Sequence, residues 1–181
     1  MTDLIEIASE GENTTPEIFD DSFCCSICEG EIRDGVEYFS CSISDEYFDD
    51  GAYTVTDSEG LTQICVSCQN KFRIIGKIEQ EAYSCVGVSY RHAGENENIA
   101  PIQNMYDCYS CSKPIWDGER ITTVTSSFET CNGNVITVSE AWIVTIICKS
   151  CESSSNIREK LAPAIDNLVA SARRRLINRV S

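Results

Sequence analysis

The sequence predicts an α+β protein built from two small β-hairpin modules of one design, each followed by a helix, with a long amphipathic helix at the C-terminus. Two observations support this prediction. Four Cys-x-x-Cys pairs form two matched sets, and every cysteine of the first set recurs 83 positions later. Runs of β-branched and aromatic residues separate the pairs of each set, and apolar residues at helical spacing follow the last pair. A fixed period of this kind indicates a duplicated unit.

The cysteine pairs favour two four-cysteine zinc sites. The proposed ligands are Cys25, Cys28, Cys65 and Cys68 in the first set, and Cys108, Cys111, Cys148 and Cys151 in the second. Tetrahedral zinc takes four thiolates at about 2.3 Å, and two such pairs supply them. Disulfides, an iron cluster or a redox dithiol are alternatives, but disulfides suit secreted proteins and the N-terminus does not resemble a signal peptide. We therefore expect two structural Zn²⁺ ions in a cytoplasmic protein of a reducing compartment, with no membrane span.

The first module is predicted to cover residues 23–83. Its β-branched and aromatic runs predict strands, and Asp-Ser-Glu-Gly predicts a turn between the last two of them. A helix should follow, because Phe72, Ile75 and Ile78/Ala82 stand at helical spacing despite Gly76. The expected strands are 36–43, 52–56 and 61–65, with the turn at 57–60 and the helix at 69–83.

The second module, residues 108–156, repeats this order, with strands expected near 119–127, 135–139 and 142–148. Residues 84–107 contain glycines, asparagines and a proline, which predict a connector between the modules. Residues 1–22 carry seven acidic and no basic residues and are predicted to be a flexible acidic arm.

Residues 157–181 predict an amphipathic helix. Asn156 and Glu159 form a possible capping pair, and Pro163 should kink or restart the helix. The stripe can dock on the second module, form a homodimer with another copy, or enter a groove of a partner. Its apolar members are Ile157, Leu161, Ala164/Ile165, Leu168, Ala172, Leu176 and Val180.

The net charge of −15 is unevenly distributed. Acidic residues dominate positions 1–107, whereas residues 157–181 contain six basic and two acidic residues. An acidic surface disfavours nucleic acid over most of the molecule, although solubility alone explains such a charge. The basic cluster Arg173, Arg174, Arg175 and Arg179 admits two interpretations: a nucleic-acid contact, or the solvent face of a helix whose C-terminal dipole favours positive charge.

The order of a cysteine knuckle, a β-hairpin and a second cysteine pair opening a helix resembles the treble-clef zinc fingers, a group that includes LIM-type and GATA-type modules. The resemblance covers residues 25–83 and 108–175, and the two cysteine sets match the metal ligands of that group. The 36 residues between the inner cysteines exceed the short hairpin of compact members, so the zinc ribbon is the close rival. The resemblance implies binding to proteins or nucleic acids.

Four cysteines and the single histidine fall outside the two sets. Cys24 is an alternative ligand to Cys25, but the repeat places Asp107 opposite Cys24 and so favours Cys25. Cys41 and Cys131 lie at unmatched positions and are predicted to be small buried or spare side chains, and Cys85 is the fourth cysteine outside the sets. His92, in the connector, has no matched ligand position and no nucleophile beside it in sequence.

The sequence thus predicts a non-catalytic zinc-binding module that contacts a protein partner through its acidic surface and C-terminal helix, as an adaptor, regulator or inhibitor. The alternative is a zinc-finger protein that binds nucleic acid through the basic helix. The sequence has no phosphate-binding loop, no His-Glu metal motif and no nucleophile elbow, so an enzyme is not expected.

Overall fold

The computed structural model describes residues 23–49, 52–87, 106–116, 118–133 and 135–178. The predicted acidic arm lies outside these residues, as do most of the predicted connector, His92 and Arg179.

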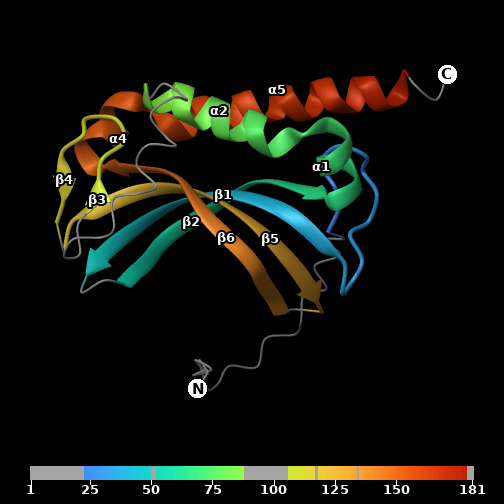
Figure 1. The fold of residues 1–181 in the computed structure, drawn as a ribbon, viewed down its shortest axis with the longest axis horizontal. Coiled ribbons are helices and arrows are strands. Elements are labelled where there is room, and N and C mark those ends of the chain that lie inside the picture. The colour runs from blue at the N-terminus through green and yellow to red at the C-terminus, as the bar shows by residue number, and fades with distance from the viewer. Residues whose placement is uncertain (1–22, 50–51, 88–105, 117, 134, 179–181) are drawn as a thin grey trace, which may run out of the picture.

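Two long antiparallel hairpins form one four-stranded sheet in the order β2-β1-β5-β6 (Figure 1). The hairpins join because β1 of the first half pairs antiparallel with β5 of the second half. The sheet is strongly curved, and a separate two-stranded sheet lies at one end of it. The strands are β1 (Glu37–Asp49), β2 (Ala52–Cys65), β5 (Arg120–Asn132) and β6 (Val135–Cys148), with β3 (Tyr106–Asp107) and β4 (Pro114–Ile115) in the small sheet.

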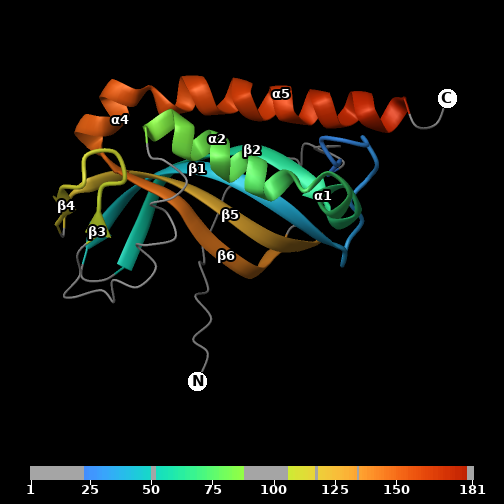
Figure 2. The same ribbon diagram turned by 45° about the horizontal axis from the view of Figure 1, so that its top comes forward.

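Helices cover one face of the sheet (Figures 1 and 2). The two longer helices, α2 and α5, contact each other across the convex face. Each buries one apolar stripe, and a shorter helix leads into each from the preceding strand. The helices are α1 (Val66–Phe72), α2 (Ile74–Val86), α4 (Lys149–Ser155) and α5 (Ile157–Ile177). This arrangement confirms the α+β class, with each four-cysteine set beside strand ends and helix starts.

The two halves have the same secondary-structure elements at equivalent positions. Every bound of β1, β2 and α1 recurs 83 positions later in β5, β6 and α4, and both hairpins carry irregularities at equivalent sites. In the central ladder Ser42 pairs with Thr125, its own counterpart in the repeat. A local two-fold axis therefore passes through this pair, as in an isologous interface between identical subunits. The sequence left open whether the modules pack together, and the β1–β5 ladder answers that question.

The predicted turn at residues 57–60 is wrong. Residues 52–65 form one continuous strand, and the pairing with β1 shifts at Cys41/Ser42 and at Asp45/Glu46. A bulge accommodates extra residues in one strand without ending the ladder, so turn-forming residues can lie inside it. The two strands predicted in the second module, 135–139 and 142–148, likewise form the single strand β6.

The predicted helix at 69–83 is two helices that meet at Arg73, which has φ 49° and ψ 53°. Asn156 takes the same left-handed conformation between α4 and α5. Asn156 does contact Glu159, by Nδ2–H to Oε2 at 3.2 Å, but its side chain does not cap the helix backbone. The helix runs on through Pro163, so the predicted restart there is wrong.

The C-terminal stripe packs inside its own chain. Ile157, Leu161, Ile165 and Ala172 are buried as predicted, and Val169, which the predicted stripe omitted, is buried with them. The equivalent positions of α2 are Ile74, Ile78, Ala82 and Val86, all buried. The helix packs mainly on α2 and also contacts β2, both in the first half, whereas the docking surface expected from the sequence was the second module. Pairing with another copy through this helix stays a prediction.

Candidate metal centres

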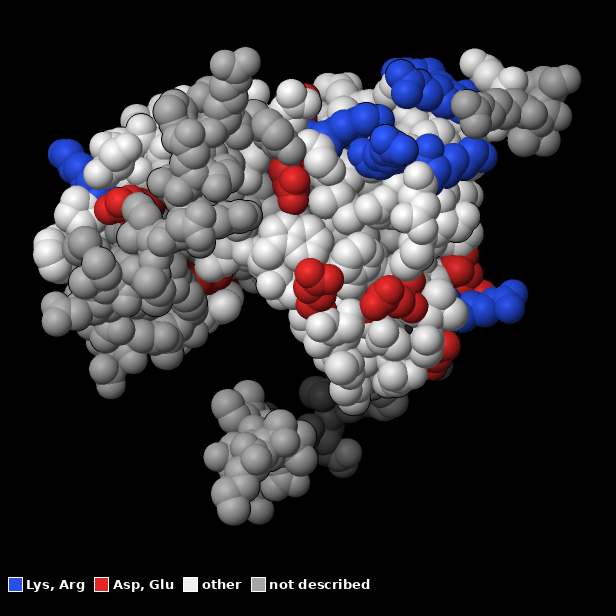
Figure 3. All heavy atoms as spheres, viewed as in Figure 1, with Lys and Arg blue, Asp and Glu red and all other residues white. Residues whose placement is uncertain are grey.

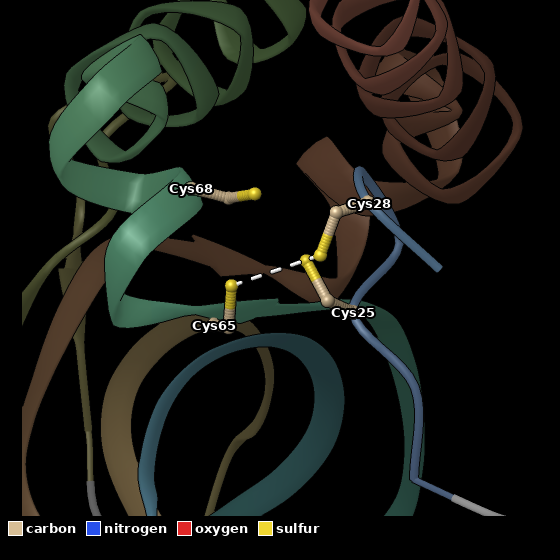
Figure 4. Close-up of side chains that lie close together, drawn as sticks. All are labelled: Cys25, Cys28, Cys65 and Cys68. Atoms are coloured by element: carbon tan, nitrogen blue, oxygen red, sulfur yellow. Dashed lines mark hydrogen bonds between the residues drawn. The ribbon is translucent and has the colours of Figure 1, made fainter. Parts of the chain in front are cut away.

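The first centre gathers four thiols from two separate segments (Figure 4). Cys25 and Cys28 lie on the loop before β1, Cys65 ends β2, and Cys68 lies in α1. Their Sγ atoms all lie within 4.8 Å of one another. Figure 4 shows the four side chains pointing toward a common centre between the loop and the start of the helix.

The loop is a tight knuckle held by backbone hydrogen bonds. Cys25 N donates to Gly30 O at 2.9 Å, and Glu29 N donates to Cys25 O at 2.9 Å. Glu29 has φ 57°, a left-handed conformation that closes the turn. Ser26 N donates to Gln63 O at 2.8 Å, so the knuckle is fixed to β2 just before Cys65. The pairing of knuckle and strand is what brings the two halves of the ligand set together.

The second centre has the same construction. The Sγ atoms of Cys108, Cys111, Cys148 and Cys151 also lie within 4.8 Å of one another. Each backbone bond of the first knuckle has its counterpart. Cys108 N donates to Lys113 O, Ser112 N to Cys108 O, and Tyr109 N to Ile146 O, at 2.7–2.8 Å.

Both centres fit zinc. Four sulfurs at about 2.3 Å from a tetrahedral ion lie about 3.8 Å apart. The Sγ–Sγ distance is 3.9 Å between Cys28 and Cys65 and 3.9 Å between Cys111 and Cys148. None of the eight cysteines forms a disulfide, and the groups are compatible with two structural Zn²⁺ ions. The structure places Cys25, and not its neighbour Cys24, among the four, which agrees with the choice made from the repeat.

The thiol pKa values differ within each set. Burial raises the pKa of Cys148, but hydrogen bonds from the Ser150 hydroxyl and the Cys151 backbone outweigh it and bring the pKa down to about 6. Burial and a hydrogen bond with Cys111 raise the pKa of Cys151 to about 12. In the first set the pKa of Cys25 is lowered, because backbone hydrogen bonds outweigh its burial, while burial raises the pKa of Cys68. Each set therefore combines a thiol that ionises more readily with thiols that ionise less readily, and a divalent cation would displace the protons that remain.

Sequence reasoning missed two polar neighbours of the centres. Ser150 Oγ lies 3.2 Å from the Sγ of Cys148. Arg173, at the far end of α5, donates from Nη2 to Ser26 O at 2.7 Å and forms an ion pair with Glu29. The contact of Arg173 could not be predicted, because Arg173 lies 147 residues from Ser26 and no local pattern links them. Ser150 could have been found, because a serine precedes the last cysteine in both sets, at Ser67 and at Ser150.

The other described cysteines take no part in the centres. Cys41 and Cys131 are buried in the core, which confirms the prediction of small buried side chains. Burial raises the pKa of Cys41 to about 12, with its neighbour Ser126 acting in the opposite sense, and Cys131 Sγ donates to Gly133 O at 3.1 Å. Cys85 is half-buried on α2, and Cys24 is exposed and pairs through a β-bridge with Glu31.

None of the described helices has the length and apolar character that crossing a lipid bilayer requires. Comparison of the chain with protein-family models, curated proteins and solved structures gives no match. The geometry of the two cysteine clusters therefore carries the assignment: this chain is a zinc-binding module of two four-cysteine centres on one shared sheet.

Proposed function

We propose that the chain is a non-catalytic protein-interaction module of the cytoplasm, which acts as an adaptor, regulator or inhibitor. A reducing compartment keeps the eight thiols available for zinc. The metal centres then make a rigid platform of the curved sheet and its helices, and the surface of that platform contacts the partner.

The observation that carries this proposal is the donor set of each centre. Four sulfur atoms fill all four positions of tetrahedral zinc, so no position is left for water or substrate. Each centre joins a knuckle to the end of a strand and the start of a helix, the points where hairpin and helix layer meet. Closed centres at such junctions contribute folding free energy and no chemistry.

One observation favours the alternative, binding to nucleic acid. Basic side chains gather at the end of the molecule where α5 finishes, beside α1 (Figure 3). Arg174 and Arg175 are exposed there, and Lys71 and Arg73 of the α1–α2 segment are exposed at the same end. Arg173 is engaged by Glu29 and Ser26, which leaves fewer free cations for phosphate than the sequence suggested.

Affinity capture of the tagged chain from its native lysate, with and without nuclease, separates these functions. We expect a stoichiometric protein partner that survives nuclease and is retained by an Arg174→Ala/Arg175→Ala variant. Partners that disappear with nuclease, together with loss of capture by that variant, would instead establish nucleic-acid binding.

A further inference from the structure

The two outer strands of the sheet are equivalent in the repeat but differ in chemistry. At the β2 edge, residues 54–60 are exposed and include Asp57 and Glu59. In β6 the stretch 135–143 includes the repeat equivalents of these residues, 137–143. It carries Val135, Ile136, Val138 and Ile143, with 63%, 50%, 53% and 36% of their surfaces exposed. Charged residues protect an edge strand from pairing with another chain. Asp57 has its equivalent in Glu140 of β6, whereas Trp142 stands in place of Glu59, so β6 is the less protected of the two edges.

The remainder of β6 is already covered. Tyr109 of the second knuckle donates from its backbone N–H to Ile146 O, and the strand is buried from Val144 to Ile147. Residues 135–143 pair with β5 on one side, and within the described residues no strand pairs with them on the other. The open edge is thus a defined segment, long enough for a strand of ordinary length.

Carboxylates lie on this strand and over the sheet beside it. Glu140 lies on β6 itself and is exposed, and Glu37 of β1 accepts a hydrogen bond from Ser139 Oγ at 2.9 Å. Glu79 of α2 accepts one from Trp142 Nε1 at 2.9 Å. Figure 3 shows acidic side chains over the region where β5 and β6 project from the molecule. An apolar strand edge with these carboxylates complements an apolar segment that also carries positive charge.

We propose that residues 135–143 of β6 bind an extended segment of the partner protein in which apolar residues alternate with Lys or Arg, and that this segment adds a fifth strand to the sheet. This inference rests on the proposed interaction function and names the partner's chemistry. Main-chain hydrogen bonds give affinity in such an addition, and the alternate side chains give specificity. A second copy of the chain is the weaker occupant, because it would bring another Glu140 to the same edge and pair like charges.

The test uses a fluorescein-labelled synthetic decapeptide of alternating Val and Lys, with the full-length, zinc-loaded chain, at about 0.15 M ionic strength. Fluorescence anisotropy should show saturable binding. An Ile136→Thr/Val138→Thr variant keeps the charge and the β-propensity of the edge but removes apolar surface, and should bind about tenfold more weakly. The matched control is Val55→Thr, the repeat equivalent of Val138 on the β2 edge with 56% exposure, which should bind as the parent chain does.

Two further peptides and a sedimentation measurement distinguish strand addition from general electrostatic attraction and from pairing with a second copy. A peptide with proline in place of every second valine cannot form the ladder and should not bind, and neither should an alternating Val-Glu peptide. Equal binding of the proline peptide, or equal weakening by Val55→Thr, would overturn the proposal, because binding would then be general electrostatic attraction. A sedimentation experiment in which the free chain is a dimer that Ile136→Thr/Val138→Thr dissociates would also overturn it, in favour of a second copy. If the Val-Lys peptide does not bind but lysate capture retrieves a protein, this inference is wrong and the proposed function stands. If the peptide binds but no protein partner is captured, the proposed function is wrong.

Discussion

Three consecutive arginines on α5 have different surroundings. Arg173 reaches the first metal knuckle, where it pairs with Glu29 and donates to Ser26 O, whereas Arg174 and Arg175 are exposed. The sequence predicted one basic cluster, because charge and helical spacing do not tell which side chain meets a segment far away in the chain. The contact of Arg173 ties the end of the second half to the metal centre of the first.

Arg173→Gln should lower the free energy of unfolding by about 1 kcal/mol, because a charge-assisted hydrogen bond to a carbonyl is lost while much of the ion pair is solvent-screened. Arg174→Gln, one position along the helix and exposed, should change it by less than about 0.5 kcal/mol. Urea denaturation of the zinc-loaded chains measures both. An equal loss in the two variants would mean that helix charge, and not the knuckle contact, is responsible.

The adjacent cysteines at the first knuckle provide a direct test of the ligand set. Cys28→Ser should reduce the zinc content from two ions per chain to one, because serine does not replace a thiolate at a tetrahedral site. Cys24→Ser alters the exposed thiol outside the cluster and should keep both ions. Metal analysis by mass spectrometry after gel filtration gives the counts. Loss of zinc in Cys24→Ser would show that the knuckle selects the other sulfur.

At the scale of elements, the helix breaks and the bulges are what sequence patterns failed to predict. Apolar spacing runs almost unbroken from α1 into α2, so periodicity alone gave a single helix. The break falls at Arg73, a residue without special turn preference, and not at Gly76. Similarly, residues 57–60 have the composition of a turn yet lie in a strand, because pairing with β1 outweighs local preference.

Arg73→Gly should stabilise the chain by about 1 kcal/mol, since a residue with a Cβ is strained at φ 49° and glycine is not. Asn156→Gly, at the equivalent break, should change stability by less, because asparagine tolerates the left-handed region. The shift of the urea midpoint measures both. A destabilised Arg73→Gly chain would indicate that contacts of the arginine side chain outweigh the backbone strain.

The whole molecule is one layered unit in which the two halves share a sheet. The cysteine spacing allowed all eight cluster residues and the α+β class to be predicted, since the ligand geometry permits few arrangements. The β1–β5 junction could not be predicted, because Tyr38, Phe39, Ser40 and Cys41 are buried in succession and give no alternation to mark a central strand. The division into modules of residues 23–83 and 108–156 stays a prediction.

A shared sheet should unfold in one step. Ile64→Ala and Ile147→Ala change equivalent, fully buried positions in the two halves, and each should cost about 3 kcal/mol. In both variants, loss of secondary structure by circular dichroism and loss of tryptophan fluorescence should coincide. Two separate transitions, each sensitive to only one substitution, would mean that the halves are stable independently.

The local two-fold axis at Ser42 and Thr125 has a consequence for stoichiometry. Two identical chains joined at such an axis must present the same outer strand on both sides, and would recruit partners in pairs. Covalent duplication releases the halves from that requirement, so one edge can keep Glu59 and Gly60 where the other carries Trp142 and Ile143. If the proposed strand addition holds, such an architecture should bind one partner strand per molecule and present a single polarity to it.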